Sequence, residues 1–235
     1  MKDLGEVKSY LGIDINYDYK KNHMSLSQEN YINSLAEKYQ IKDSTLYTTP
    51  MEVNLKLEPA QELRKDIKYR NLIGALLYIS SGTRPDITFC VNYLSRFQNC
   101  YDGTHYKYCL RILKYLYLTK NLKLNYHRNE NAKVLDCYVD SDWAGDNIDR
   151  KSTTGYVIRM FGNVVFWKSR KQSCVTKAST YAEYVALSDA VSEVKFLKNV
   201  TKIFDLNFDE PIVMYEDNSW ALSIAKYEYN CKEAC

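Results

Sequence analysis

Three acidic residues occupy positions from which their carboxylates could meet at the rim of a β-sheet. Asp140 ends an apolar run that begins at Val134, and such a run predicts a buried strand. Asp217 follows a second apolar run, Ile212 to Tyr215, and Glu183 lies near the start of a long predicted helix. Carboxylate oxygens are the ligands that hard divalent cations prefer. We therefore expect Asp140, Glu183 and Asp217 to converge on one divalent-cation site.

Each acid in this region also has a structural interpretation. Thr180 and Glu183 have the spacing of a capping box, in which the glutamate accepts a hydrogen bond from a backbone N–H at the start of a helix. Asp217 could cap the short helix expected after it. Asp142 and Asp146 follow the predicted strand and are typical turn residues. On the sequence alone these alternatives stay open.

Two basic clusters flank a predicted β-hairpin that follows the first acidic segment. A solvated surface would explain them in an arbitrary protein, but clusters beside a cation site also suit contact with a nucleic-acid backbone. The candidate nucleic-acid-binding residues are Arg150, Lys151, Lys168, Arg170 and Lys171.

The elements that must position these residues divide the chain into two parts. Alternating apolar residues predict a strand around residues 11–17, and residues 42–66 have the composition of an extended connector. Apolar residues at helical spacing then predict a series of helices. These cover 27–39, 69–80, a stretch that restarts after Pro85, and 104–118.

From about residue 131 the pattern changes to strands. A hairpin is predicted from strands at 154–160 and 164–169 with a turn at Gly162-Asn163. A long helix is expected over 179–204, with Ala182, Ala186 and Ala190 on a narrow face that can lie close to a sheet. A strand at 212–215 and a short helix at 219–227 follow.

The composition favours a folded protein outside the membrane. Hydrophobic residues make up 46% and charged residues 26% of the 235 residues, which allows a packed core and argues against global disorder. No apolar run approaches the roughly 18 residues of a membrane-spanning helix, and the N-terminus lacks a signal-peptide core. The seven cysteines have no paired spacing and are expected to be reduced thiols. We therefore expect a cytoplasmic or nuclear protein that is not secreted.

A set of short motifs, in this order, resembles one known family. The chain is similar to the C-terminal part of a copia-type (Pseudoviridae) retrotransposon Pol polyprotein, in which the end of the reverse transcriptase precedes a ribonuclease H domain. The similarity covers nearly the whole chain. The matching motifs are YLGIDI, YRNLIGALLY, TRPDI, LSRF, RILKYL, YVDSDWAGD, DRKSTTGYV, WKSRKQ, AEYVAL and EDNSWA, preceded by Asp3-Leu4-Gly5.

The resemblance implies a fold and a domain order. Residues 131–235 are expected to form an α/β (α+β) domain with a ribonuclease H-like mixed sheet and packed helices, lacking its last strand and helix. Residues 21–130 resemble the mainly helical thumb and connection module, and residues 1–20 resemble the end of the polymerase palm. The paired aspartates of the polymerase lie upstream of Asp3-Leu4-Gly5 in this family, which implies that this chain has no polymerase active site.

The resemblance also implies a reaction. Asp140, Glu183 and Asp217 match catalytic, Mg²⁺-binding carboxylates that cleave the RNA strand of RNA–DNA hybrids. In two-metal hydrolysis one ion lowers the pKa of the attacking water and the other stabilises the leaving oxygen. The family's fourth carboxylate falls in a segment that the sequence lacks, so we expect one of the two ions to bind weakly.

Two functions from different classes are therefore expected. The first is a truncated reverse transcriptase/ribonuclease H fragment that cuts hybrids with Mg²⁺. The second is a catalytically inactive or co-opted retroelement remnant that binds nucleic acid or a protein partner. The expected partners are an RNA–DNA hybrid or other nucleic acid, and either a chain that supplies the missing elements or a second copy paired at an exposed sheet edge; no membrane partner is expected.

Overall fold

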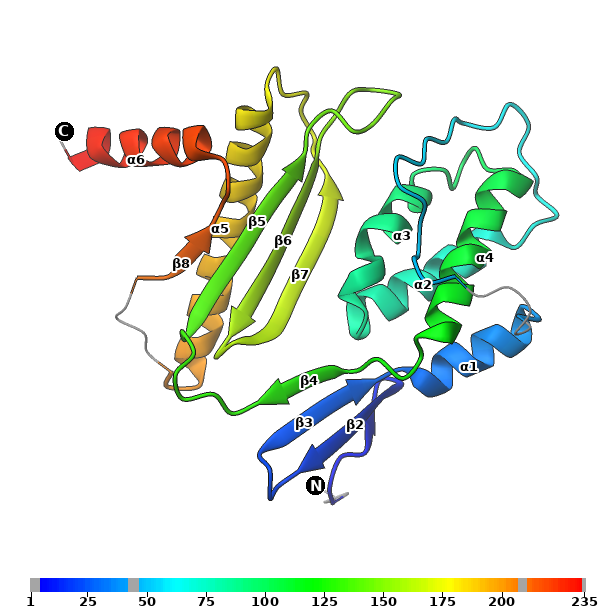
Figure 1. The fold of residues 1–235 in the computed structure, drawn as a ribbon, viewed down its shortest axis with the longest axis horizontal. Coiled ribbons are helices and arrows are strands. Elements are labelled where there is room, and N and C mark those ends of the chain that lie inside the picture. Colours follow the sequence, from blue (N-terminus) through cyan, green and yellow to red (C-terminus); the bar gives the residue numbers. More distant parts are fainter. Residues whose placement is uncertain (1–4, 42–46, 207–210, 234–235) are drawn as a thin grey trace. The chain divides into compact units, whose positions relative to one another are not determined.

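The computed structural model describes residues 5–41, 47–206 and 211–233. Within these ranges the chain is a mixed α/β protein with two four-stranded sheets and six α-helices (Figure 1). It divides into two compact units, Met1–His127 and Arg128–Cys235, which we call unit 1 and unit 2. Asp3-Leu4 and residues 42–46 of the predicted connector lie outside the described residues. No described helix has both the length and the apolar character needed to cross a membrane.

Unit 1 contains an antiparallel sheet in the order β1-β2-β3-β4. The strand predicted around residues 11–17 is β2, and Leu11-Gly12, with φ values of 50° and 73°, form the turn that precedes it. Two strands in the region predicted to be helical, β3 and β4, pair with each other, and His23 stacks on His127 at 4.4 Å between ring centroids. Their shortness left too little alternation to detect them. The strands are β1 (Ser9–Tyr10), β2 (Ile13–Asp18), β3 (His23–Ser27) and β4 (Leu124–His127).

The helices of unit 1 enclose one apolar core. Leu72, Leu76, Val91 and Leu113 are fully buried in it. The first helix begins two residues later than predicted because Ser27 still belongs to β3. The helices are α1 (Glu29–Lys38), α2 (Tyr69–Gly82), the 3₁₀ turn η1 (Pro85–Ile87), α3 (Thr88–Ser95) and α4 (Gly103–Leu118).

A fully buried arginine ties these helices together. The Nε and Nη2 atoms of Arg84 donate to the carboxylate of Asp86 at 2.9 and 2.7 Å, and Nη1 donates to the carbonyl oxygen of Thr119 at 3.1 Å. The Tyr115 hydroxyl donates to the same carboxylate at 2.7 Å. Charge-assisted bonds of this kind are among the strongest in proteins. Arg84 thus joins the start of η1 to the end of α4.

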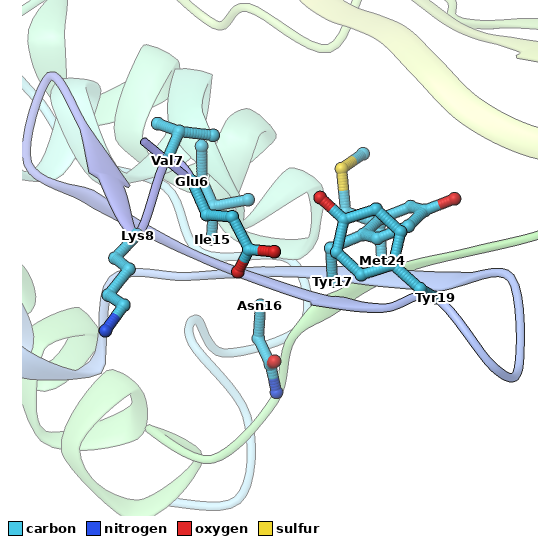
Figure 2. Close-up of a pocket in the computed structure, with 8 residues that line it drawn as sticks. All are labelled: Glu6, Val7, Lys8, Ile15, Asn16, Tyr17, Tyr19 and Met24. Atoms are coloured by element: carbon cyan, nitrogen blue, oxygen red, sulfur yellow. The ribbon is translucent and has the colours of Figure 1, made fainter. Parts of the chain in front are cut away.

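An open pocket of about 490 Å³ lies on the sheet of unit 1 (Figure 2). Its aromatic part is formed by Tyr17 and Tyr19, whose rings meet edge to face at 4.4 Å between centroids, with Met24 behind them. Lys8 and Glu6 supply the charged part. None of the candidate site residues named above lines this pocket.

Unit 2 is a four-stranded mixed sheet in the order β7-β6-β5-β8, in which only β8 runs parallel to its neighbour, β5. Ala182, Ala186 and Ala190 of helix α5 are fully buried, so the predicted narrow face is confirmed. The elements are β5 (Leu135–Asp142), β6 (Thr153–Met160), β7 (Asn163–Lys171), α5 (Ser179–Ile203), β8 (Val213–Tyr215) and α6 (Ser219–Glu233).

The β6–β7 hairpin turn lies one residue earlier than predicted. Phe161 and Gly162 occupy it, with φ values of 50° and 77°. Asn163 is already part of the strand ladder, paired with Met160. Positive φ at both turn positions is the geometry whose twist matches paired strands, and glycine adopts it without steric cost.

Candidate metal centre

The structure brings the three predicted carboxylates together at one rim of the sheet in unit 2. Asp140 lies near the end of β5, Asp217 lies two residues beyond β8, and Glu183 lies on α5. Because β5 and β8 are parallel neighbours, their carboxyl ends reach the same rim (Figure 1). One carboxylate oxygen from each residue lies within 4.8 Å of those of the other two. This arrangement suits a shared divalent cation.

The capping interpretations of Glu183 and Asp217 are wrong. Helix α5 begins at Ser179 with Ala178 as its N-cap, and no side chain accepts a hydrogen bond at that cap. At the start of α6 the cap is Asn218, whose Oδ1 accepts from the N–H groups of Trp220 and Ala221 at 3.1 and 3.0 Å. Neither acid is therefore held in place by a helix end.

Glu183 is a buried acid with an unsatisfied oxygen. Its side chain is only 7% exposed, and its Oε2 has no hydrogen-bond partner among the described residues. Burial and then the negative charges of Glu216, Asp140 and Asp217 raise the pKa of Glu183 to about 7. A cation beside this carboxylate would compensate both effects.

Glu216 is a fourth acid at this rim, and the sequence reasoning missed it. It is half-buried, and its Oε2 is also buried without a hydrogen-bond partner among the described residues, while Oε1 accepts from the N–H of Asn218 at 3.1 Å. Burial raises the pKa of Glu216, and the negative charges of Asp217 and Asp140 raise it further. The hydrogen bond from the N–H of Asn218 acts in the opposite direction but is outweighed. Alternation along a strand is the signal that could have found it, because Met214 and Glu216 lie on the side opposite Tyr215.

The four acids have no cationic neighbour within the described part of the chain. None of Asp140, Glu183, Glu216 and Asp217 forms an ion pair there. Carboxylates gathered without counter-charge repel one another and lose hydration. The donor set of Asp140, Glu183 and Asp217, three carboxylates with no histidine or cysteine, fits Mg²⁺.

The two acids interpreted as turn residues behave differently from the carboxylates at the rim. Asp146 is buried and accepts hydrogen bonds from Lys171 at 2.6 Å and from the N–H of Ile148 at 2.9 Å. Burial opposes its ionisation, but these donors outweigh it and lower the pKa of Asp146 to about 2. Asp142 is exposed, and its carboxylate lies against Gly145. Any residue with a Cβ at position 145 would place that atom 1.9 Å from Oδ2 of Asp142, which is a clash. Both therefore shape the loop after β5.

The five candidate basic residues fall into two groups. Lys168 is paired with Glu193 at 3.0 Å, and Lys171 with Asp146 and Asp149, while Lys151 lies 3.6 Å from Asp149. These lysines already have acidic partners. Arg150 and Arg170 are exposed, and neither has an ion pair within the described residues. Contact with a phosphate backbone stays a prediction for all five, and it is simplest for the two arginines.

Replacing Lys171 by alanine is expected to destabilise unit 2 by about 1.5–3 kcal/mol, the usual value for a hydrogen bond to a charged group. The change leaves the buried carboxylate of Asp146 without its cation. Arg170→Ala, one residue away on an exposed side chain, is the control and should cost about 0.5 kcal/mol or less. Urea unfolding followed by tryptophan fluorescence measures both, since Trp143, Trp167 and Trp220 all lie in unit 2. Equal destabilisation by the two variants would contradict the structural role of Lys171.

Comparison with known proteins identifies relatives over most of the chain. The retrovirus-related Pol polyprotein from transposon TNT 1-94 of Nicotiana tabacum is 33% identical over 96% of this chain. That from transposon RE1 of Arabidopsis thaliana is 34% identical over 93% of it. The chain spans only 17% and 15% of the lengths of these two relatives.

A shorter relative matches part of the chain. The secreted RxLR effector protein 161 of Plasmopara viticola is 40% identical over 57% of this chain and 93% of its own length. No family model matches the chain, and no solved structure matches it significantly. Over nearly its whole length the chain is therefore homologous to a segment of the Pol polyproteins of copia-type retrotransposons.

Proposed function

We propose that unit 2 is a ribonuclease H-like nuclease domain that cleaves RNA in RNA–DNA hybrids with Mg²⁺. The observation that carries the proposal is the meeting of Asp140, Glu183 and Asp217, with oxygens within 4.8 Å of one another, at the rim of a mixed sheet. Homology to retrotransposon Pol polyproteins supports a retroelement-derived chain. Residues 21–130 then correspond to the thumb and connection region and residues 1–20 to the end of the palm, and DNA synthesis is not part of the proposal.

The roles of the carboxylates follow from their burial. Glu183 is fixed by its place on α5 and provides a buried ligand, whereas Asp140 and Asp217 are exposed and face solvent at the rim. An exposed pair of ligands leaves room for a phosphodiester and an attacking water. When bound, Mg²⁺ supplies Lewis-acid activation of that water and of the leaving oxygen.

The hybrid is held by charge in this proposal. Arg150 and Arg170 are exposed on the segment after β5 and on β7. Arginine is suited to phosphate because its planar fork can donate two parallel hydrogen bonds. Contacts to phosphate carry no sequence information, so the expected substrate is any RNA–DNA hybrid.

The test is cleavage of a hybrid whose RNA strand carries a fluorescent label. The full chain should cut it in Mg²⁺ or Mn²⁺, and EDTA should stop the reaction. Asp140→Asn should reduce cleavage to the background level because it removes one anionic ligand. Asp142→Asn is the matched control, since it neutralises an acid on the same strand that is outside the group of three; it should retain cleavage.

Two results would overturn the nuclease. The chain could bind the hybrid, measured by fluorescence anisotropy, without cutting it in either metal, which would favour the inactive nucleic-acid-binding remnant. Alternatively, cleavage could survive Asp140→Asn, which would place the activity elsewhere.

A further inference from the structure

Two buried carboxylate oxygens at the rim of unit 2 lack any hydrogen-bond partner within the described residues: Oε2 of Glu183 and Oε2 of Glu216. Glu183 is more than nine-tenths buried and belongs to the group of three oxygens described above. An unsatisfied buried carboxylate oxygen costs free energy comparable to a lost hydrogen bond or more. Two unsatisfied carboxylate oxygens at the same rim indicate that a cation or a hydrogen-bond donor completes the site.

The backbone directs both side chains to the same place. Glu216 directly follows β8, and the pairing of Val213 with Asp136 and of Tyr215 with Tyr138 fixes the register of that strand. Alternation then puts Glu216 on the side of Met214, which packs into the core beneath α5. Glu183 is on α5, which packs against β5, the neighbour of β8 in the sheet.

Glu216 is outside the group of three mutually close oxygens. A direct bond from Glu216 to the same ion is therefore not the simplest arrangement. Mg²⁺ usually keeps several of its waters and is held by only one or two carboxylates directly. A carboxylate just beyond the ligands can accept hydrogen bonds from such waters, and outer groups of this kind tune metal affinity.

We infer that Glu216 is a fourth acidic residue of the cation site and that its buried Oε2 binds water held by the cation. The inference rests on the proposed function for the identity of the site. Glu216 adds a fourth negative charge to those of Asp140, Glu183 and Asp217. With Glu216, the chain itself supplies four carboxylates for the metal.

The test is Mn²⁺ binding to the full chain, measured by the loss of the free-ion electron paramagnetic resonance signal during titration. Mn²⁺ prefers the same hard oxygen ligands as Mg²⁺. Glu216→Gln keeps the shape of the side chain and removes its charge, and it should weaken Mn²⁺ binding about 10–100-fold, as for outer-shell groups in general. Asp140→Asn is the positive control and should weaken binding at least as much.

Asp142→Asn is the matched negative control and should leave Mn²⁺ affinity unchanged. Tryptophan fluorescence melts establish that each variant is folded, and Glu216→Asp provides a second variant that keeps the charge and should retain most of the affinity. Unchanged Mn²⁺ affinity in folded Glu216→Gln, or no Mn²⁺ binding by the unaltered chain, would overturn the inference.

The two proposals fail in different ways. A chain that binds Mn²⁺ with dependence on Glu216 but leaves hybrids intact supports the role of Glu216 at the cation site and overturns the nuclease. A chain that cuts hybrids while Glu216→Gln binds Mn²⁺ normally supports the nuclease and overturns the role of Glu216.

Discussion

Replacing Arg84 by alanine is expected to destabilise unit 1 by about 3–5 kcal/mol, the range for breaking a buried ion pair by removing one partner. Arg84 is 2% exposed, and its guanidinium donates hydrogen bonds to Asp86 and Thr119. Its loss leaves the Asp86 carboxylate partly buried with only the Tyr115 hydroxyl and removes the link to the end of α4. Such a loss is a large fraction of the stability of an ordinary domain.

A second arginine in unit 1 that pairs with an aspartate two residues later provides the control. Arg64 donates to Asp66 at 2.9 and 2.8 Å with the same spacing and the same two-bond geometry, but both side chains are more than half exposed. Exposed ion pairs are screened by water and contribute little to stability, so Arg64→Ala should leave the unfolding transition almost unchanged. Arg84→Lys keeps the charge without the planar fork and should recover only part of the loss.

In urea unfolding, far-ultraviolet circular dichroism reports on the helices of both units, while tryptophan fluorescence reports on unit 2 alone. The unfolding of unit 1 is therefore the part of the circular dichroism change that fluorescence does not follow. The expected result is an earlier transition in the first signal, with little change in the second. Equal effects of Arg84→Ala and Arg64→Ala would mean that burial does not decide the strength of these pairs.

Unit 2 is expected to lose stability as the pH rises from about 4.5 to about 7 in the absence of divalent cations. The pKa of Glu183 is raised from its ordinary value of 4.5 to about 7, so between these values the folded state binds more protons than the unfolded state. Stability then falls with rising pH, by at most about 3 kcal/mol for a shift of this size. The raised pKa of Glu216 acts in the same direction.

Glu183→Gln should flatten this dependence, because a neutral amide does not titrate. Asp189→Asn, at an exposed position on the same helix, should leave it unchanged. Tryptophan fluorescence is a clean measure because His23, His105 and His127 all lie in unit 1 and cannot contribute to the titration of unit 2. Adding Mg²⁺ at pH 8 should restore stability to the unaltered chain, since a ligand that binds only the folded state stabilises it. Equal unfolding free energies at pH 5 and pH 8 would contradict the prediction.

The sequence predicted the meeting of Asp140, Glu183 and Asp217 because each of these residues lies near the end of a strand or the start of a helix. Asp140 and Asp217 each come after an apolar run long enough to be recognised, and the small residues of α5 indicated which face of the helix meets the sheet. Glu216 was missed because it comes after the apolar run ends at Tyr215. Alternation places Glu216 on the side of Met214, but only the packing of Met214 in the folded unit shows that this side faces the core.

The parts of the fold that could not be predicted depend on contacts between distant residues. Strands β3 and β4 have five and four residues, and each is stabilised by pairing with a segment about a hundred residues away. The acidic partners of Lys171 were equally hidden, because Asp146 lies 25 residues earlier in the chain. Local composition indicated a helical region for the two strands and a solvated surface for Lys171, and it could not reveal what these residues touch.

The pairing of β3 with β4 also determines the order of events during synthesis of the protein. Residue 127 emerges from the ribosome long after residue 23, and at the usual 5–20 residues per second the delay is roughly 5–20 s. During that interval the newly made β3 presents an unpaired edge, while the helices between the two strands can already assemble. Completion of the N-terminal sheet is therefore one of the last steps before unit 2 begins to appear, and a nascent chain halted before residue 124 would expose a strand ready to pair with a neighbour.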